Sequence, residues 1–314
     1  MKLGIDMGGM SIKMGLVNEE NKIIGRITIP TDLTVPYQTL VERMADAVRQ
    51  MLENAGMTLE QCGGIGIGSP GTIDAKQGVI LYSNNFGWEN VPIVEELKKH
   101  LDVGIEIAND ADAAALGEVC AGAAEGAENA VLLTLGTGVG SGVILDKKIF
   151  RGAMPGGCEL GHLSIRYDGI RCTCGRKGCL EAYASASALL RIAREKAAEH
   201  PESIMNEMCG NDLEQMNGKI PFDAAKAGDE AGMETVKEYE GYLACGIANV
   251  INTFRPEKVI LGGGVAAQKD NLTAPLKDLV KDMCFGGSHG HIADIVTSVL
   301  GNDAGIIGAA NLVV

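Results

Sequence analysis

The stretch LGIDMGGMSIKMGLV (residues 3–17) decides the fold. Apolar residues recur on both sides of the pair Gly8–Gly9, a pattern that predicts a strand, a glycine turn and a second strand. Residues 18–21 then form a second turn, and residues 22–29 form a third strand. The N-terminal segment is therefore predicted to be a three-stranded β-meander.

A second copy of this pattern lies further along the chain, in LLTLGTGVGSGVIL (residues 132–145). The copies are in register when Gly136 is aligned with Gly8, and residues 146–148 repeat the second turn. Such an internal repeat indicates two similar α/β domains. Each glycine turn exposes backbone N–H groups that suit phosphate oxygens. Two ordinary hairpins remain the alternative, because neither stretch is a Walker P-loop.

The two copies differ at the residue that ends the first strand. Asp6 occupies this position in the first copy, and Thr134 is its counterpart in the second. A single carboxylate beside a phosphate-binding turn suits Mg²⁺ that is held partly through water. Asp6 is therefore the magnesium candidate.

Hydrophobic periodicity and glycine or proline breaks predict the remaining elements. Helices are expected at residues 37–54, 183–199, 222–227, 230–254 and 302–311, and strands at 64–68, 104–108, 258–261 and near 292–299. The strand at 258–261 leads into Gly262–Gly264. This bare backbone suits the flat base or ribose of a nucleotide, but a tight turn explains the glycines nearly as well.

Asn109 and Asp110 follow the strand at 104–108 and precede an alanine-rich helix. Either residue is a good helix N-cap. A carboxylate at the carboxyl end of a strand is also where α/β enzymes place their chemistry. The residue pattern alone leaves both interpretations open.

The glycine-rich loop GGCELGHLSIRYDGIRCTCGRKGCLE (residues 156–181) contains a candidate zinc site. Cys172, Cys174, Cys179 and His162 match the ligand set of a closed four-coordinate site, which indicates a structural zinc. Unpaired thiols beside an unrelated histidine are the alternative. Glu159 and Glu181 flank the ligands, so a bound metal would also fix these two carboxylates.

Composition limits the class of protein. The 314 residues suffice for two domains or one large one, and 46% hydrophobic with 22% charged residues is ordinary for a globular protein. A net charge of −14 disfavours a nucleic-acid partner. No secretory segment or membrane-spanning run is evident, so a cytoplasmic protein is expected, whose nine cysteines do not form a disulfide framework.

Eight motifs together resemble the ROK family of sugar kinases and repressors, most closely its bacterial glucokinases, over nearly the whole chain. They are GIDMGGMSIK (4–13), GSPGTID (68–74), NFGW (85–88), NDADAAALGE (109–118), LTLGTGVGSGVI (133–144), the cysteine loop ending in GCLE, LGGGV (261–265) and GNDAGIIGAA (301–310). The resemblance implies an α/β actin-like ATPase (ribonuclease H-like) fold with two domains around a central cleft. The N-terminal domain would comprise residues 1–110 and about 300–314, and the C-terminal domain, with the zinc loop, residues 111–299.

The resemblance also implies the site residues. Asp110 would be the general base, and His162 would bind zinc through one ring nitrogen and sugar through the other. The implied sugar ligands are Gly71, Asn85, Asn109, Asp110, Glu159, His162 and Glu181. The implied ATP ligands are Gly8, Gly9, Met10, Lys13, Gly136, Thr137, Gly138, Gly262 and Gly263. Three positions depart from the family pattern: Met10 replaces a threonine, Asp112 an asparagine and Ser141 a glycine.

The implied activity is ATP-dependent phosphorylation of glucose at its 6-hydroxyl, with Mg²⁺ and a structural Zn²⁺ as cofactors, in a homodimer. A kinase for another hexose, such as N-acetylmannosamine or fructose, is the first alternative. A sugar-responsive repressor is the second. It is the weaker, because such repressors carry an N-terminal helix-turn-helix, whereas here the first predicted strand begins at Leu3.

Overall fold

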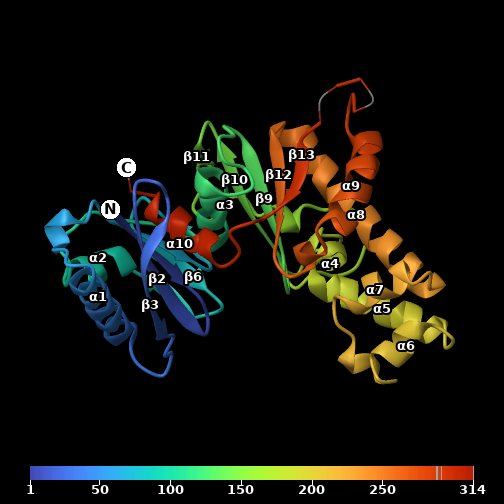
Figure 1. Cartoon of the computed structure of the whole chain (residues 1–314), viewed down its shortest axis with the longest axis horizontal. Coiled ribbons are helices and arrows are strands. Elements are labelled where there is room, and N and C mark those ends of the chain that lie inside the picture. Colours follow the sequence, from blue (N-terminus) through green and yellow to red (C-terminus); the bar gives the residue numbers. More distant parts are fainter. Residues whose placement is uncertain (288, 291, 314) are drawn as a thin grey trace. The chain divides into compact units, whose positions relative to one another are not determined.

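The computed structural model describes residues 1–287, 289–290 and 292–313, which form an α/β structure (Figure 1). Its residues divide into two compact units: a first unit of residues 1–132, 142–158 and 299–314, and a second of residues 133–141 and 159–298. Val314, the last residue of the first unit, lies outside the described residues, as do residues 288 and 291 of the second. The domain boundaries expected near residues 110 and 300 stay a prediction. Within the described residues, none of the helices combines the length and apolarity that crossing a bilayer requires.

The first sheet has the strand order β3-β2-β1-β4-β8. Its strands are β1 (Lys2–Met7), β2 (Ser11–Val17), β3 (Ile23–Pro30), β4 (Ile65–Ser69) and β8 (Ile105–Asn109). β1 and β2 pair antiparallel, as do β2 and β3, whereas β1, β4 and β8 are parallel. The predicted meander and the two buried strands are confirmed to within about two residues.

The second sheet repeats this plan, with the order β11-β10-β9-β12-β13. Its strands are β9 (Ala130–Leu135), β10 (Val139–Leu145), β11 (Lys148–Ile149), β12 (Lys258–Gly262) and β13 (Asp294–Thr297). β10 and β11 pair antiparallel and β12 and β13 parallel, as do their counterparts β2 with β3 and β4 with β8. The internal repeat predicted from the aligned glycines is therefore a repeat of sheet topology.

Glycines allow the helices of the first unit to pack closely on its sheet. Helix α10 (Asp303–Ala310) lies against β1 and against α3 (Asp110–Ala121) (Figure 1). A Cβ atom at Gly4 would overlap the carbonyl of Ile306, and one at Gly117 would overlap that of Ala304. Larger residues at these two positions would push α10 away. The C-terminal helix predicted at 302–311 is confirmed.

Four short elements of the first unit were not predicted from the sequence. These are β5 (Thr72–Asp74), β6 (Val79–Ser83) and β7 (Trp88–Val91), which form a three-stranded sheet, and α2 (Ile93–Lys98). Trp88 packs against Phe86 and against Tyr37 of α1 (Tyr37–Asn54), with ring centroids 4.9 and 6.1 Å apart. The tryptophan thus joins the small sheet to α1, which has its predicted bounds.

The helices of the second unit are α4 (Glu181–Ala184), α5 (Ala186–Glu199), α6 (Ile204–Met208), α7 (Ile220–Lys226), α8 (Glu230–Phe254) and α9 (Asp270–Met283). The single helix predicted at 183–199 is wrong, because the chain breaks at Ser185. This residue is extended (φ −75°, ψ 167°), and its side chain accepts a hydrogen bond from the amide of Ala188 as the N-cap of α5. Helix α9 was not predicted. Helix α8 has its predicted bounds and ends at Arg255, in the left-handed region (φ 50°).

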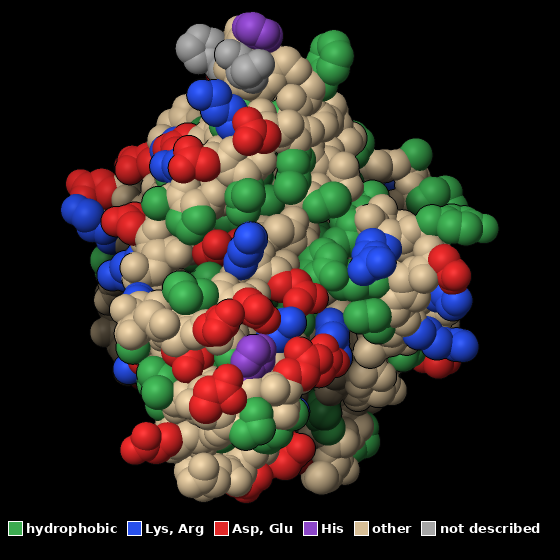
Figure 2. Space-filling model, turned by 90° about the vertical axis from the view of Figure 1, so that its right-hand side faces the viewer, with side chains coloured by type: hydrophobic (Ala, Val, Ile, Leu, Met, Phe, Trp, Pro, Cys, Tyr) green, Lys and Arg blue, Asp and Glu red, His purple; other side chains and the backbone are tan. Residues whose placement is uncertain are grey.

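Figure 2 shows acidic and basic side chains mixed on one face of the molecule. In the second unit, ion pairs such as Lys196–Glu234 (3.1 Å) and Arg191–Glu195 (3.1 Å) join basic side chains to neighbouring acidic ones. On the face shown, basic side chains do not form the continuous stripe that is typical of nucleic-acid binding.

Candidate functional site

Three parallel strands of the first unit bring Asp6 and Asp110 to the carboxyl end of the same sheet. Asp6, near the end of β1, pairs with Gly68 of β4, which pairs with Ala108 of β8. A Cβ atom at Gly68 would lie 3.7 Å from the Cα of Asp110. The two carboxyl groups are close enough for the charge of Asp110 to raise the pKa of Asp6. The sheet thus places the magnesium candidate beside the predicted base.

Asn109 is the N-cap of α3, which settles one alternative that the sequence left open. Its Oδ1 accepts hydrogen bonds from the amides of Ala111 (2.9 Å) and Asp112 (3.4 Å). Its Nδ2 donates to the carbonyl of Gly71 (3.1 Å), so it also fixes the Ser69–Thr72 turn. Capping therefore explains Asn109, whereas Asp110 is the first residue of the helix.

Burial perturbs both carboxyl groups. It raises the pKa of Asp110, an effect that the hydrogen bond from the Ala111 amide partly offsets. Burial also raises the pKa of Asp6 to about 6; the charge of Lys13 opposes this shift and that of Asp110 adds to it. Lys13 lies opposite Asp6 in the β1–β2 pair. Such tuned carboxyls are typical of catalytic sites.

The first glycine turn, between β1 and β2, is held by backbone contacts. The amide of Gly8 donates to the carbonyl of Ser11 (3.0 Å), and the hydroxyl of Thr31 donates to the carbonyl of Gly8 (2.6 Å). The Met10 side chain is 90% exposed. It offers no hydroxyl, so at position 10 only the backbone N–H remains for a phosphate.

The second glycine turn, between β9 and β10, lies against the start of α5. The amide of Ala186 donates to the carbonyl of Gly136 (2.8 Å), and the hydroxyl of Ser187 donates to that of Thr137 (2.9 Å). Gly263, after β12, has φ +83°, and its Cβ position lies 2.5 Å from the carbonyl oxygen of Leu135. Close packing therefore explains the glycine at 263, and its nucleotide contact stays a prediction.

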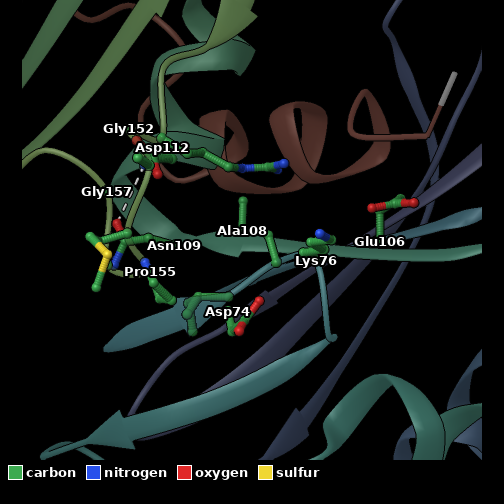
Figure 3. Close-up of a pocket in the computed structure, with 15 residues that line it drawn as sticks. Asp74, Lys76, Glu106, Ala108, Asn109, Asp112, Gly152, Pro155 and Gly157 are labelled. Carbon is green, nitrogen blue, oxygen red and sulfur yellow. Dashed lines mark hydrogen bonds between the residues drawn. The ribbon is translucent and has the colours of Figure 1, made fainter.

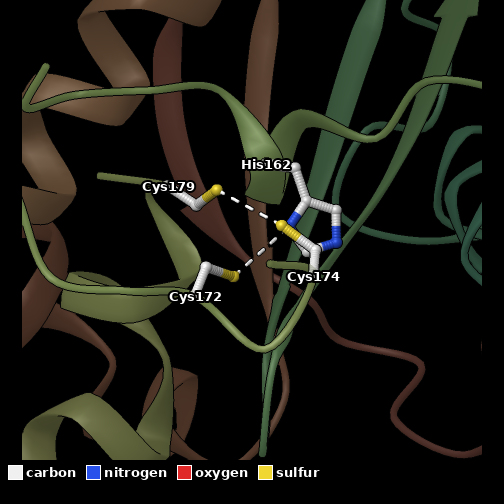
Figure 4. A group of neighbouring side chains, drawn as sticks. All are labelled: His162, Cys172, Cys174 and Cys179. Atoms are coloured by element: carbon white, nitrogen blue, oxygen red, sulfur yellow. Dashed lines mark hydrogen bonds between the residues drawn. The ribbon is translucent and has the colours of Figure 1, made fainter. Parts of the chain in front are cut away.

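His162, Cys172, Cys174 and Cys179 converge on one point (Figure 4). Their ligand atoms all lie within 4.8 Å of one another. His162 Nδ1 is 3.7 Å from Cys172 Sγ, and the Sγ atoms of Cys174 and Cys179 are 3.6 Å apart. Zn–S bonds of about 2.3 Å in a tetrahedron give ligand separations of about 3.8 Å, so the cluster fits zinc. The Nδ1 atom faces the thiols, which leaves Nε2 for another partner.

Metal binding at this cluster would displace protons. Burial raises the pKa of Cys172, and that of Cys179 to about 12. The thiolate is the form that binds zinc, so loading the site releases protons and becomes pH-dependent.

Glu181 joins the cysteine loop to the second glycine turn. One carboxylate oxygen accepts a hydrogen bond from the amide of Val139 (3.0 Å) and the other from the hydroxyl of Thr173 (3.1 Å). A Cβ atom at Gly138 would overlap this carboxylate. A side chain at position 138 would therefore have to displace the Glu181 carboxylate from these two hydrogen bonds.

Ser141 supports the other predicted sugar-binding turn. Its buried hydroxyl accepts a hydrogen bond from the amide of Leu160 (2.9 Å), directly after Glu159. Sequence reasoning noted Ser141 only as a departure from a family glycine and did not identify Thr173. Ser141 contacts a residue 19 positions away, whereas Thr173 contacts Glu181 only eight positions away within the cysteine loop. Neither hydroxyl belongs to a recognisable motif, so its partner could not be predicted.

The first unit also contains a polar cavity of about 480 Å³ (Figure 3). Asn109 and Asp112 lie toward one end of it, and Lys76 and Glu106 toward the other. Asp110 is not among its lining residues. Asn85 is exposed in the turn between β6 and β7. The cavity size suits a small ligand.

Comparison with known proteins decides the family. The model of the ROK family matches residues 2–314. The chain belongs to the ROK family. A glucokinase from Thermotoga maritima is 36% identical, over 99% of this chain and 96% of that protein.

Two solved structures of ROK proteins show that the similarity includes the fold of this chain. A ROK family glucokinase from Streptomyces griseus, in complex with glucose and AMPPNP, has a TM-score of 0.79 at 31% identity, covering 99% of this chain and 98% of that one. A ROK hexokinase from Thermus thermophilus has a TM-score of 0.81 at 32% identity, covering 99% and 97%. The fold is the actin-like ATPase fold of ROK sugar kinases, as the resemblance implied.

Proposed function

We propose that this ROK protein transfers the γ-phosphoryl group of ATP to the 6-hydroxyl of glucose. The observation that carries the proposal is the full-length similarity to glucokinases, one of them solved with glucose and AMPPNP. The positions of Asp6 and Asp110 at the carboxyl ends of parallel strands support it.

Asp110 acts as the general base. Its carboxylate accepts the proton of the 6-hydroxyl while the hydroxyl oxygen bonds to the γ-phosphorus and the bond from phosphorus to ADP breaks. The raised pKa makes the carboxylate a better proton acceptor than an exposed aspartate. It still has to be ionised at the working pH, so activity decreases as the solution is acidified through that pKa.

The hexose hydroxyls are bound by Gly71, Asn85, Asn109, Glu159, His162 and Glu181. Carboxylates and a ring nitrogen accept hydrogen bonds from hydroxyl groups, and a site of this kind rejects a sugar that lacks one of them. The fixed positions of Asn109 and Glu181 support this assignment, because an ordered polar group loses little entropy on binding.

The nucleotide phosphates are bound by the N–H groups of the two glycine turns, at Gly8–Met10 and Gly136–Gly138, with Lys13 nearby. Gly262 and Gly263 lie beside the nucleoside. Asp6 would hold Mg²⁺, and the charge of this ion would neutralise phosphate oxygens of the nucleotide. Lys13 and Asp6 lie opposite each other on adjacent strands, which supports their joint role.

The cysteine cluster binds a structural zinc ion, because the protein fills all four positions. We place the protein in the cytoplasm, where a reducing environment keeps the thiol ligands free. The homodimer rests only on the family resemblance.

The proposal is tested by measuring ADP release with a panel of hexoses, using ATP and polyphosphate as donors. We expect the highest kcat/KM with glucose and ATP. Equal or higher kcat/KM with N-acetylmannosamine or fructose would replace glucose as the substrate. No ADP release with any hexose, together with binding to duplex DNA at physiological salt, would contradict the kinase and favour a repressor.

A further inference from the structure

Glu118 is a fully buried carboxylate in the second half of α3 (0% exposed). It belongs to the motif NDADAAALGE, which the proposed function uses only at Asn109 and Asp110. A buried charge is costly unless hydrogen bonds compensate it, so its partners indicate what it does.

Three backbone amides donate to Glu118. One is the amide of Ala123 (2.7 Å), just beyond the end of α3. The others are the amides of Val299 (3.1 and 3.3 Å) and Leu300 (3.0 Å), which are distant in sequence. Hydrogen bonds from N–H groups to a carboxylate are charge-assisted and stronger than neutral ones. Glu118 therefore fixes α3 to the start of the C-terminal segment.

Val299 is also where the chain passes from the second unit to the first. The amide of Ser298 donates to the carbonyl of Leu261 in β12 (2.8 Å), within the second unit. The next amide, that of Val299, donates to Glu118 of the first unit. Two consecutive amides are thus held by different units, at the point where the chain passes from one unit to the other.

The same contact reaches the proposed catalytic groups through two packed helices. Asp110 begins α3, and α10 begins shortly after Leu300. A Cβ atom at Gly305 of α10 would lie 2.9 Å from Cγ of Asp6. A shift at Glu118 would therefore be transmitted to Asp110 through α3 and to Asp6 through α10.

We propose that Glu118 is a positioning residue for phosphoryl transfer: its carboxylate holds α3 and α10 at the passage between the units, so that Asp110 and Asp6 keep their working geometry. This inference rests on the proposed function. Glu118 touches neither substrate, so its loss affects the rate of transfer more than ligand affinity.

The test compares Glu118→Gln with the wild type. Glutamine keeps the size of the side chain but replaces one acceptor oxygen with an NH₂ group that cannot accept from the amides. We expect kcat to fall at least tenfold while KM for hexose and ATP changes less than threefold. Hydrogen exchange should accelerate at the amides of Val299 and Leu300 but not at Ser298. Glu125→Gln, an exposed change just beyond α3, is the matched control and should leave kcat unchanged.

Wild-type kcat in Glu118→Gln, with accelerated exchange at Val299 and Leu300, would overturn the inference. So would unchanged exchange at these amides. If Glu118→Gln does not fold, Val299→Pro removes one donor while leaving the carboxylate, and retention of full kcat in that variant contradicts the proposal. A wild-type chain that phosphorylates no hexose would instead contradict the proposed function. In that case the exchange rates at residues 298–300 would still decide whether Glu118 holds this segment.

Discussion

At the scale of single residues, Asp6 and Asp110 are two carboxyl groups with raised pKa values at the carboxyl end of the same sheet. Titratable groups that the environment tunes separately are the usual sign of divided roles. Lys13 is on the strand next to Asp6 and favours its ionised form, as a cation ligand needs. Hydrogen bonds to Asp110 come mainly from its own helix turn, which leaves its carboxylate available to a hydroxyl.

Replacing Asp110 with asparagine removes the proposed base. We expect kcat to fall by about 10²–10⁴-fold, the usual contribution of general base catalysis, with little change in hexose affinity. Rates come from ADP release and affinity from calorimetry. Asp282→Asn, an exposed change in α9, is the control. A near-normal rate in Asp110→Asn would exclude this residue as the base.

Replacing Asp6 with asparagine should increase the free energy of unfolding and weaken Mg²⁺ binding. A carboxyl whose folded pKa is raised contributes stability below its unfolded pKa, and that contribution is lost as pH rises through the folded value. The change from 3.8 to about 6 corresponds to a penalty of up to about 3 kcal/mol at neutral pH, which asparagine avoids.

Denaturant unfolding of the Asp6→Asn variant at pH 7.5 and pH 4 measures this effect. We expect the gain in unfolding free energy at pH 7.5 to shrink at pH 4, and the Mg²⁺ concentration for half-maximal activity to rise. A variant less stable than wild type at pH 7.5, or unchanged in its Mg²⁺ requirement, would contradict the assignment.

At the scale of elements, the start of β10 connects three segments of the second unit that carry predicted site residues. Val139 follows the glycine turn and donates to Glu181, whereas Ser141 accepts from the turn that carries Glu159 and His162. Glu181 in turn contacts Thr173, which lies between Cys172 and Cys174 of the cysteine cluster. The sequence predicted each segment but not these contacts, because side-chain to backbone hydrogen bonds between segments carry no sequence signature.

Zinc should bind to the cysteine cluster with one ion per chain and should stabilise the fold. Metal analysis of purified protein should give about one zinc per chain. Cys174→Ser should lose the metal and lower the melting temperature, because a structural zinc site contributes folding free energy directly. Cys158→Ser, in the same loop but outside the cluster, should do neither. Fully active, stable protein without zinc would exclude the structural role.

Two helices show where local sequence signals succeed and fail. Helix α9 was missed although Leu272, Leu276 and Val280 recur at helical spacing and are buried, so the signal was present. The break at Ser185 could not be predicted, because the amide of Ala186 bonds to Gly136 of a distant turn. Tertiary contacts there override a continuous helical pattern.

At the scale of the whole molecule, the duplicated meander determined most of what the sequence could predict. Aligning Gly8 with Gly136 predicted a repeated meander in two similar domains, and the structure shows that the repeat extends to the order of all five strands in each sheet. The spacing of His162 and the three cysteines predicted the cysteine cluster separately, because its ligands lie close together in the sequence. Glu118 escaped notice because its partners, Val299 and Leu300, are far along the chain.

The central claim is that Asp110 accepts the proton of the hexose 6-hydroxyl. A crystal structure with glucose and a non-hydrolysable ATP analogue tests it most directly. We predict that the 6-hydroxyl oxygen lies about 2.6–3.2 Å from an Asp110 carboxylate oxygen and points toward the γ-phosphate. Glucose bound with that hydroxyl out of hydrogen-bonding reach of Asp110 would contradict the account.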